Sequence, residues 1–295
     1  MNKIKIGYFA DGPWSHLAFE KIIEDKSIEV KFIVPRSDSQ DKTLEKFSNQ
    51  YNVDYFKLSN VNDEESLKII ESYDCDVLVS MSFNQIFKKK IIELTKYGII
   101  NCHAGKLPFY RGRNILNWVL INDEKEFGIT VHFVDEGIDT GDIILQEVFP
   151  INESDNYKTL LEVAFEECAR MIYEGIKRIQ QENFTIRKQS EIHPIGMYCG
   201  RRGEGDERIN WQDNSRNIHN FIRAICFPGP KAQTYLGSEV ITINSSSFIS
   251  QAPNYIGKPG QVLSKTSEGY LVKTGDSFIE ILEVSKKLKI GKVLK

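Results

Sequence analysis

The sequence predicts an α/β fold with a mostly parallel sheet, followed by a small β-barrel-like domain. Strand and helix patterns alternate from residue 4 to about residue 102, and residues 75–83 form an apolar run short enough for a strand buried on both faces. From residue 232 onward, short β patterns alternate with turn residues, as in a small barrel. A glycine- and charge-rich stretch at 198–208 separates the two patterns, so we expect domains at 1–204 and 205–295.

The elements of the first domain follow from periodicity and turn residues. Buried or alternating apolar patterns predict strands at residues 4–9, 30–34, 53–58, 75–83, 98–102, 128–134 and 143–148. Helical patterns cover residues 15–25, with Ser15 as the cap, and residues 41–52, 62–72, 88–96, 114–121 and 154–181. The second domain is expected to begin with a helix at residues 215–226. The opening GYFADGPW departs from GxGxxG, so a dinucleotide site is weakly supported.

Composition points to a soluble enzyme. Of the 295 residues 41% are hydrophobic and 27% charged, and the net charge of −3 gives no support for a nucleic-acid partner. The five cysteines lack CxxC spacing, which favours a reduced, cytoplasmic protein without structural zinc. Neither a signal-peptide h-region nor a run of about 18 apolar residues is visible, so no membrane segment is expected.

Residues Gly98–Asp142 concentrate the chemically capable groups. Asn101 and His103 stand two residues apart at the end of a predicted strand, so their side chains share one face. Asn101 can hydrogen-bond an oxyanion, and His103 can take a proton from an attacking amine. A histidine base needs an orienting partner, and Asp139, between Gly137 and Gly141, is the carboxylate we select over Asp135 and Asp142. The pattern therefore favours acyl transfer to an amine.

Other chemistries at this stretch remain open. The acidic loop could bind calcium, although its spacing differs from the EF-hand. His103, Cys102 and Asp139 could suggest a metal site, but no further histidine stands at ligand spacing. Cys102 could be a nucleophile, but it should point to the opposite face from His103. Lys106, Arg111 and Arg113 lie in the next loop, where cations would suit an anionic substrate such as a diphosphate.

The motif NxHxxxLPxxRG, followed by DxGxDTGD, resembles the 10-formyltetrahydrofolate-dependent formyltransferases. These include enzymes that act on methionyl-tRNA, on glycinamide ribonucleotide and on amino sugars. The segments NFIRAICFPGPKAQTY and KPGQVLSKTSEGYLVKTGDSFIEILEV resemble the C-terminal domain of the tRNA and sugar enzymes. The resemblance implies a Rossmann-like formyltransferase domain followed by an OB-type barrel-like domain. One departure is HAGKLP, where Gly105 and Lys106 replace the Ser and Leu that are usual in the family.

The resemblance also implies roles for individual residues. The catalytic Asn, His and Asp fall on Asn101, His103 and Asp139, and no metal is expected. The co-substrate 10-formyltetrahydrofolate is expected at the carboxyl ends of two strands, where the matching residues are Met81, Ser82, Phe83, Asn84, Asp135, Gly137 and Asp139.

The expected acceptor is a nucleotide-linked amino sugar. The run RGRNILNWVLIND resembles enzymes acting on nucleotide-linked 4-amino sugars, so we expect a dTDP- or UDP-linked 4-amino-4,6-dideoxy sugar, as used in O-antigen or surface polysaccharide biosynthesis. The expected contacts are Gly12, Trp14, Lys106, Tyr110, Arg111, Arg113 and Asn114. A methionyl-tRNA formyltransferase and a non-catalytic nucleotide-sugar binding module are the alternatives, and a homodimer is the commonest assembly for such proteins.

Overall fold

The structure is a computed structural model that describes residues 3–39 and 41–295. The chain divides into two compact units. The first contains residues 1–112, 128–149 and 163–198, and the second contains residues 113–127, 150–162 and 199–295. Both units are therefore assembled from segments that are far apart in the sequence.

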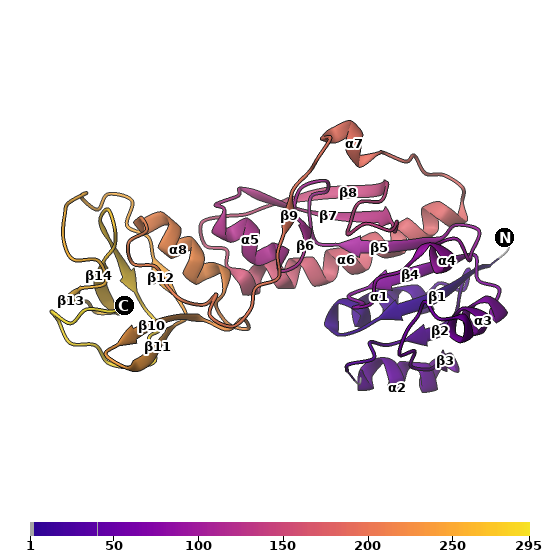
Figure 1. Cartoon of the computed structure of the whole chain (residues 1–295), viewed down its shortest axis with the longest axis horizontal. Coiled ribbons are helices and arrows are strands. Elements are labelled where there is room, and N and C mark those ends of the chain that lie inside the picture. The colour runs from indigo at the N-terminus through magenta and orange to yellow at the C-terminus, as the bar shows by residue number, and fades with distance from the viewer. Residues whose placement is uncertain (1–2, 40) are drawn as a thin grey trace. The chain divides into compact units, whose positions relative to one another are not determined.

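A seven-stranded sheet forms the centre of the first unit (Figure 1). Its order is β3-β2-β1-β4-β5-β7-β8. The pairs β1–β2, β1–β4, β2–β3 and β4–β5 are parallel, whereas β5–β7 is antiparallel. The strands are β1 (Ile4–Ala10), β2 (Ile28–Val34), β3 (Asp54–Tyr55), β4 (Val77–Met81), β5 (Ile99–His103), β7 (Glu126–Phe133) and β8 (Ile143–Pro150). The predicted mostly parallel α/β class is confirmed.

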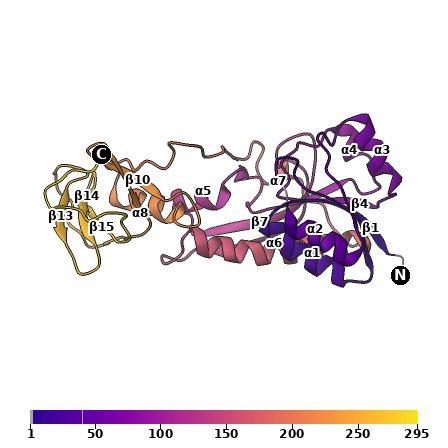
Figure 2. The same cartoon turned by 90° about the horizontal axis from the view of Figure 1, so that it is seen from below.

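Helices cover both faces of this sheet, with α1 and α6 on one side and α3 and α4 on the other (Figure 2). On the first side, Phe19 of α1 stacks on Phe47 of α2, and Trp14 meets Phe165 of α6 edge-on. On the second side, Leu67 of α3 and Ile91 of α4 join a buried apolar cluster. The helices in or entering this unit are α1 (Pro13–Glu24), α2 (Lys42–Tyr51), α3 (Glu64–Ser72), α4 (Lys89–Ile92), α6 (Tyr157–Gln180) and α7 (Gln189–Ile192).

The local sequence explains the central strands. All five residues of β4, VLVSM, are buried, because helices on both faces exclude water from a central parallel strand. The sheet positions the ends of β4 and β5 side by side, with Ser80 opposite Asn101. Polar residues that follow these strands are thereby brought to one edge of the sheet.

Several element boundaries differ from the sequence prediction, and three of them are described here. Helix α1 begins at Pro13 behind Gly12, not at Ser15, because proline fits the first helical turn and the Ser15 hydroxyl donates to the Gly12 carbonyl instead of capping. The strand predicted at 53–58 is reduced to the edge strand β3. The helix predicted at 88–96 ends at Ile92.

Antiparallel strands dominate the second unit. β10 (Ala232–Leu236) pairs with β11 (Glu239–Ile243), and a four-stranded sheet has the order β12-β15-β14-β13. An isolated antiparallel bridge pairs Ile243 of β11 with Val284, which lies outside the named strands. The four-stranded sheet contains β12 (Ser246–Ser247), β13 (Val262–Lys265), β14 (Tyr270–Lys273) and β15 (Phe278–Ile281). These strands agree with the predicted C-terminal β domain.

Two helices complete the second unit. The Asn117 amide of α5 (Ile115–Ile121) donates to the Ala224 carbonyl of α8 (Ser215–Ala224) over 2.5 Å. Arg216 of α8 bonds both Asp123 and Glu153. Outside the sheets already named, short strand β6 (Arg111–Gly112) pairs with β9 (Tyr198–Cys199).

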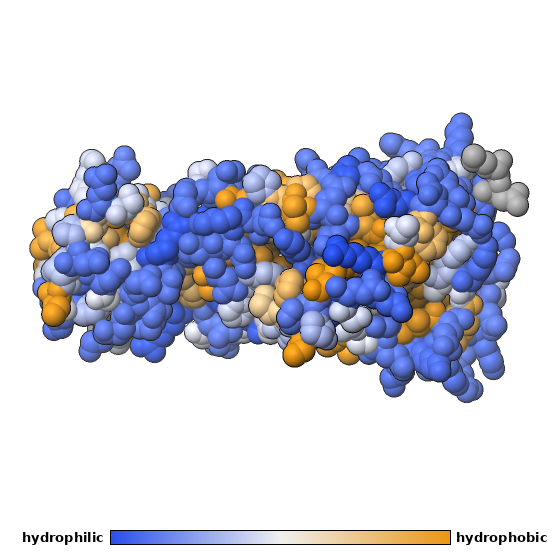
Figure 3. Space-filling view, turned by 90° about the horizontal axis from the view of Figure 1, so that it is seen from above, coloured by the Kyte–Doolittle hydropathy of each residue, from blue (hydrophilic) through white to orange (hydrophobic). Residues whose placement is uncertain are grey.

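On the surface, hydrophobic residues of the visible face gather in patches that hydrophilic residues separate (Figure 3). Within the described residues, no helix combines the length and the apolar character that crossing a membrane requires. All five cysteines are buried and carry free thiols.

Candidate active site

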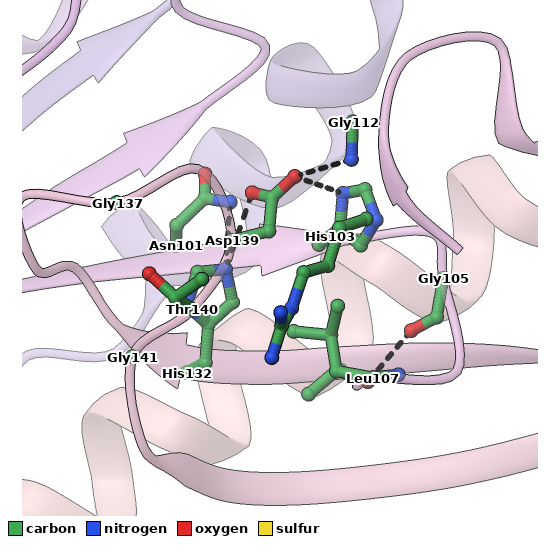
Figure 4. Close-up of polar contacts among 12 residues, drawn as sticks. Asn101, His103, Gly105, Leu107, Gly112, His132, Gly137, Asp139, Thr140 and Gly141 are labelled. Carbon is green, nitrogen blue, oxygen red and sulfur yellow. Dashed lines mark hydrogen bonds and ion pairs between the residues drawn. The ribbon is translucent and has the colours of Figure 1, made fainter. Parts of the chain in front are cut away.

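The end of β5 presents Asn101 and His103 on one face of the sheet. Cys102 points to the opposite face, where its thiol contacts Cys168 of α6. The antiparallel pairing of β5 with β7 places Asn101 opposite His132 and His103 opposite Thr130. Figure 4 shows Asn101, His103, His132 and Asp139 gathered in one site.

The proton positions on His103 follow from its hydrogen bond. His103 Nε2 lies 2.7 Å from the Tyr110 carbonyl oxygen. A carbonyl can only accept, so Nε2 carries the proton and Nδ1 has the free lone pair. His103 Nδ1 lies 3.7 Å from Asp139 Oδ2, which is longer than a direct hydrogen bond. The tautomer is therefore set by Tyr110, and the basic nitrogen faces Asp139.

Asp139 is held between two imidazole rings. Its Oδ2 accepts a 2.8 Å hydrogen bond from the Gly112 N–H, and its Oδ1 lies 3.7 Å from His132 Nε2. Burial raises the pKa of the Asp139 carboxyl, but His103, His132 and the Gly112 N–H together lower it by more. The net pKa lies below the ordinary value, so Asp139 is ionised at neutral pH.

The loop that carries Asp139 is shaped by its other polar residues and glycines. Asp135 Oδ1 accepts from the Gly137 N–H over 3.0 Å and from the Thr140 hydroxyl over 2.5 Å. Asp139 itself has a left-handed φ of 53°. A Cβ at Gly141 would lie 1.8 Å from the Phe133 carbonyl oxygen, so only glycine fits there. The sequence prediction that glycines bend this loop has a physical basis.

His132 belongs to the site and was missed by the sequence reasoning. Its Nδ1 lies 2.8 Å from the Phe133 carbonyl, so Nδ1 is protonated and Nε2 accepts from the Asn101 amide over 3.2 Å. Burial is the main reason why the pKa of His132 is lowered, which keeps the ring neutral. The residue could be found only from the β5–β7 register, because nothing in its local sequence marks it.

The loop after His103 is fixed by a second network. The Thr130 hydroxyl donates to the Gly105 carbonyl over 2.7 Å, and the Gln146 amide donates to the Leu107 carbonyl over 2.8 Å. A Cβ at Gly105 would lie 2.4 Å from His103 Nε2 and 2.5 Å from the Tyr110 carbonyl oxygen. The His103 ring and the Tyr110 carbonyl, which are hydrogen-bonded to each other, therefore occupy the space that a side chain at residue 105 would need. This gives a physical reason for Gly105 where the family usually has Ser.

Gly105→Ala is expected to lower kcat by about 100-fold, because the new methyl group displaces His103 or Tyr110 by a sizeable fraction of an ångström. Steady-state kinetics would measure the loss. Gly203→Ala is the matched control, since nothing lies within 4 Å of a Cβ at Gly203, and it should keep wild-type kcat. A Gly105→Ala variant with wild-type kcat would show that the His103–Tyr110 contact is dispensable.

The residues predicted to hold folate lie beyond β4. Met81 is buried, and Ser82 has a left-handed φ of 56°. Phe83 stacks on Phe87 with ring centroids 5.6 Å apart. The Asn84 Oδ1 atom is buried and has no hydrogen-bond partner among residues 3–39 and 41–295. An unpaired buried acceptor is costly and fits a site that a donor group of a ligand completes.

The residues predicted to bind the acceptor are dispersed. The Gly12 N–H donates to Asp41 Oδ2 over 2.7 Å, and Trp14 packs edge-on against Phe165 at 4.6 Å. Tyr110 contributes its carbonyl to His103. Arg111 directs its guanidinium to the Gln189 side chain and to the Ile195 carbonyl.

The remaining predicted acceptor residues have well-defined backbone surroundings. The Lys106 Cβ lies close to Gly128 of β7. The loop that carries Lys106 can approach β7 this closely only because Gly128 has no side chain. Arg113 and Asn114 belong to the second unit, where the Arg113 N–H donates to the Cys199 carbonyl. Asn114 precedes α5 with a left-handed φ of 57°, and its Oδ1 accepts from the Arg202 N–H over 2.9 Å. Among the residues that the structure describes, no group of three or more His, Cys, Asp or Glu is arranged to hold a metal ion.

Comparison with known proteins identifies the class. Residues 19–174 match the formyl transferase family, and residues 203–293 match the formyl transferase C-terminal domain. The chain belongs to the formyl transferase family.

Relatives of two kinds are similar to this chain. The methionyl-tRNA formyltransferase of Syntrophomonas wolfei subsp. wolfei is 31% identical over 243 residues, which cover 82% of this chain and 76% of that protein. The crystal structure of WlaRD, a sugar 3N-formyl transferase, in the presence of dTDP and 5-N-formyl-THF, is 25% identical with a TM-score of 0.72, covering 98% of this chain and 100% of WlaRD. An N-formyltransferase from Helicobacter canadensis, in complex with folinic acid and dTDP-3-aminofucose, shares the fold at 23% identity and a TM-score of 0.70, covering 96% and 100% of the two chains.

Proposed function

We propose that this protein transfers the formyl group of 10-formyltetrahydrofolate to the amine of a nucleotide-linked amino sugar. The observation that carries the proposal is the grouping of Asn101, His103 and Asp139 at the end of β5, with the His103 Nδ1 lone pair directed toward the Asp139 carboxylate. This is the set of groups that acyl transfer to a neutral amine requires.

Asn101 stabilises the oxyanion that forms when the amine adds to the formyl carbon. Its side-chain amide has two N–H groups, and one is donated to His132 Nε2. Among the described residues no contact of the second N–H is recorded, so we assign it to the developing oxyanion. Because His132 is neutral and buried, it fixes the amide plane before the substrate arrives. Such preorganised donors are effective because they need little reorganisation during the reaction.

His103 accepts the proton of the attacking amine at Nδ1. The Tyr110 carbonyl holds the opposite ring nitrogen, and the Asp139 carboxylate stabilises the imidazolium that results. The proton then passes from His103 to the leaving nitrogen of the folate, as the C–N bond to the formyl carbon breaks. Amide product and tetrahydrofolate are released, and His103 is neutral again.

The folate would bind beside Met81–Asn84 and the loop at residues 135–139. The unpaired Asn84 Oδ1 offers an acceptor for a donor group of the folate. That a folate is the donor is supported by WlaRD, which was crystallised with 5-N-formyl-THF and is similar over nearly the whole chain. Within the first unit, the expected contacts to the acceptor remain with Gly12, Trp14, Lys106 and Tyr110.

For the acceptor, a dTDP-linked amino sugar has the stronger support. The similarity to WlaRD, crystallised with dTDP, covers 98% of this chain, and the net charge of −3 is unfavourable for a polyanion such as tRNA. The sequence favours an amine at C4 of a 4,6-dideoxy sugar, whereas WlaRD is a sugar 3N-formyl transferase. Methionyl-tRNA is the second candidate acceptor, favoured by the 31% identity to the enzyme of Syntrophomonas wolfei.

A panel of acceptors separates these functions. The purified protein is given 10-formyltetrahydrofolate with dTDP- and UDP-linked 3-amino and 4-amino sugars or with methionyl-tRNA, and products are read by mass spectrometry. We expect one formyl group on a dTDP-linked amino sugar. Formylation of methionyl-tRNA without any sugar product would replace the proposal by the second candidate. Binding of nucleotide sugar without transfer would assign a non-catalytic binding module.

A further inference from the structure

A buried glutamine outside the predicted site is connected to Asp139. Gln189, the first residue of α7, is 3% exposed. Its amide Nε2 donates to the Asp139 carbonyl over 2.9 Å and to the Gly141 carbonyl over 2.7 Å. Its Oε1 accepts from Arg111 Nε over 3.0 Å and from another nitrogen of the same guanidinium over 2.7 Å. All four hydrogen-bonding positions of the side chain are used.

The hydrogen bonds of Gln189 hold the backbone at Asp139, where the conformation is unfavourable. Asp139 has a left-handed φ, which costs energy for a residue with a Cβ and needs support from its surroundings. One planar amide holds the carbonyls of Asp139 and Gly141 together, so it fixes the turn that directs the carboxylate. The side chain of Asp139 is held separately, because its Oδ2 accepts a hydrogen bond from the Gly112 N–H.

Arg111, whose guanidinium donates to Gln189, is itself held by further hydrogen bonds. Its third guanidinium contact is the Ile195 carbonyl at 3.0 Å, and its own N–H donates to the Met197 carbonyl. The guanidinium is thereby committed to protein groups, which weakens the prediction that Arg111 binds substrate phosphate. Tyr110, Arg111 and Gly112 are consecutive, and each holds one part of the His103–Asp139 pair.

We propose that Gln189 is a positioning residue for formyl transfer: it connects the Arg111 guanidinium to the backbone of Asp139 and so holds the Asp139 carboxylate against His103. The inference rests on the proposed function for its kinetic consequence. Its structural consequence, the placement of the carboxylate, is independent of which acceptor is used.

The kinetic test is a double-mutant cycle. Gln189→Met keeps the length of the side chain and removes its hydrogen bonds, and we expect kcat to fall by about tenfold to 100-fold with little change in either KM. In an Asp139→Asn background the same substitution should cost less than about threefold, because the carboxylate that Gln189 positions is already absent. An equal loss in both backgrounds would overturn the proposal, as would wild-type kcat in Gln189→Met.

Gln180→Met is the matched control. Gln180 also connects a cation to a backbone carbonyl, since its Oε1 accepts from Lys177 Nζ over 2.7 Å and its Nε2 donates to the Ser27 carbonyl over 2.9 Å. Gln180→Met should keep wild-type kcat and show no coupling to Asp139→Asn. If Gln189→Met does not fold, Gln189→Glu carries the test, because it still accepts from Arg111 but cannot donate to the two carbonyls. It should lose kcat in the same coupled manner.

A second readout needs no substrate and so separates this inference from the proposed function. The carboxyl carbon of Asp139 is titrated by NMR, with its signal assigned by its absence in Asp139→Asn. In the wild type the pKa should lie below the ordinary aspartate value, and in Gln189→Met it should move upward as the carboxylate leaves its partners. An unchanged titration would overturn the positioning role, even for a protein that formylates none of the acceptors tested.

Discussion

His103→Asn is expected to lower kcat by about 100-fold to 10,000-fold, the usual cost of losing a general base. In the wild type, His103 Nδ1, which faces Asp139, accepts the proton of the attacking amine. Asparagine has no basic nitrogen, so the variant has no group to accept this proton. Donor binding should survive, because the folate is expected at Met81–Asn84, beyond the neighbouring strand. Single-turnover kinetics with saturating donor, together with a titration of donor affinity, would measure both quantities.

Cys102→Ala is the matched control for this prediction. Cys102 adjoins His103 in β5 but faces Cys168 on the other side of the sheet. Its replacement should leave kcat within a few-fold of the wild type, and it also tests whether Cys102 acts as a nucleophile. His103→Asn with near-normal turnover, or an inactive but folded Cys102→Ala, would contradict the assignment of the base.

Asn101→Ala is the second substitution with a large expected effect. Removing one oxyanion donor typically costs about 100-fold to 1,000-fold in kcat. Here the loss also frees His132 Nε2, which the Asn101 amide satisfies at 3.2 Å. The effect should fall on kcat much more than on the KM for either substrate, because the oxyanion exists only after the amine has added.

The control for Asn101→Ala is an asparagine away from the site whose side-chain amide also donates a hydrogen bond. The Asn49 amide donates to the Glu45 carbonyl on the exposed surface of α2, and Asn49→Ala should keep wild-type kcat. Thermal unfolding of all variants would separate loss of fold from loss of chemistry. If Asn101→Ala raised KM and left kcat intact, Asn101 would be a ground-state binding residue and the oxyanion role would be rejected.

Much of the fold is predictable because local patterns are strong. The mostly apolar, fully buried strand β4 and the alternation with helices indicate a mostly parallel α/β sheet, and the short strands after residue 232 indicate a C-terminal β domain. The sequence prediction is wrong mainly at short elements at the edge of the sheet. Residues 53–58 have a strand-like composition, yet only Asp54–Tyr55 finds pairing partners at the sheet edge.

For the candidate site, the sequence by itself determines which groups stand at the end of β5. The two-residue spacing of Asn101 and His103 puts them on one face, and the glycines around Asp139 allow its loop to turn. Those inferences need only the period of a strand and the small size of glycine, so they are local.

Only the tertiary structure decides how these groups are held. His132 reaches Asn101 through the antiparallel register of β5 and β7, Tyr110 sets the His103 tautomer with its carbonyl, and Gln189 reaches Asp139 from 50 positions away in the sequence. The physical reason is that backbone carbonyls and N–H groups are the same in every residue, so their role as partners depends on geometry and leaves no mark in the sequence.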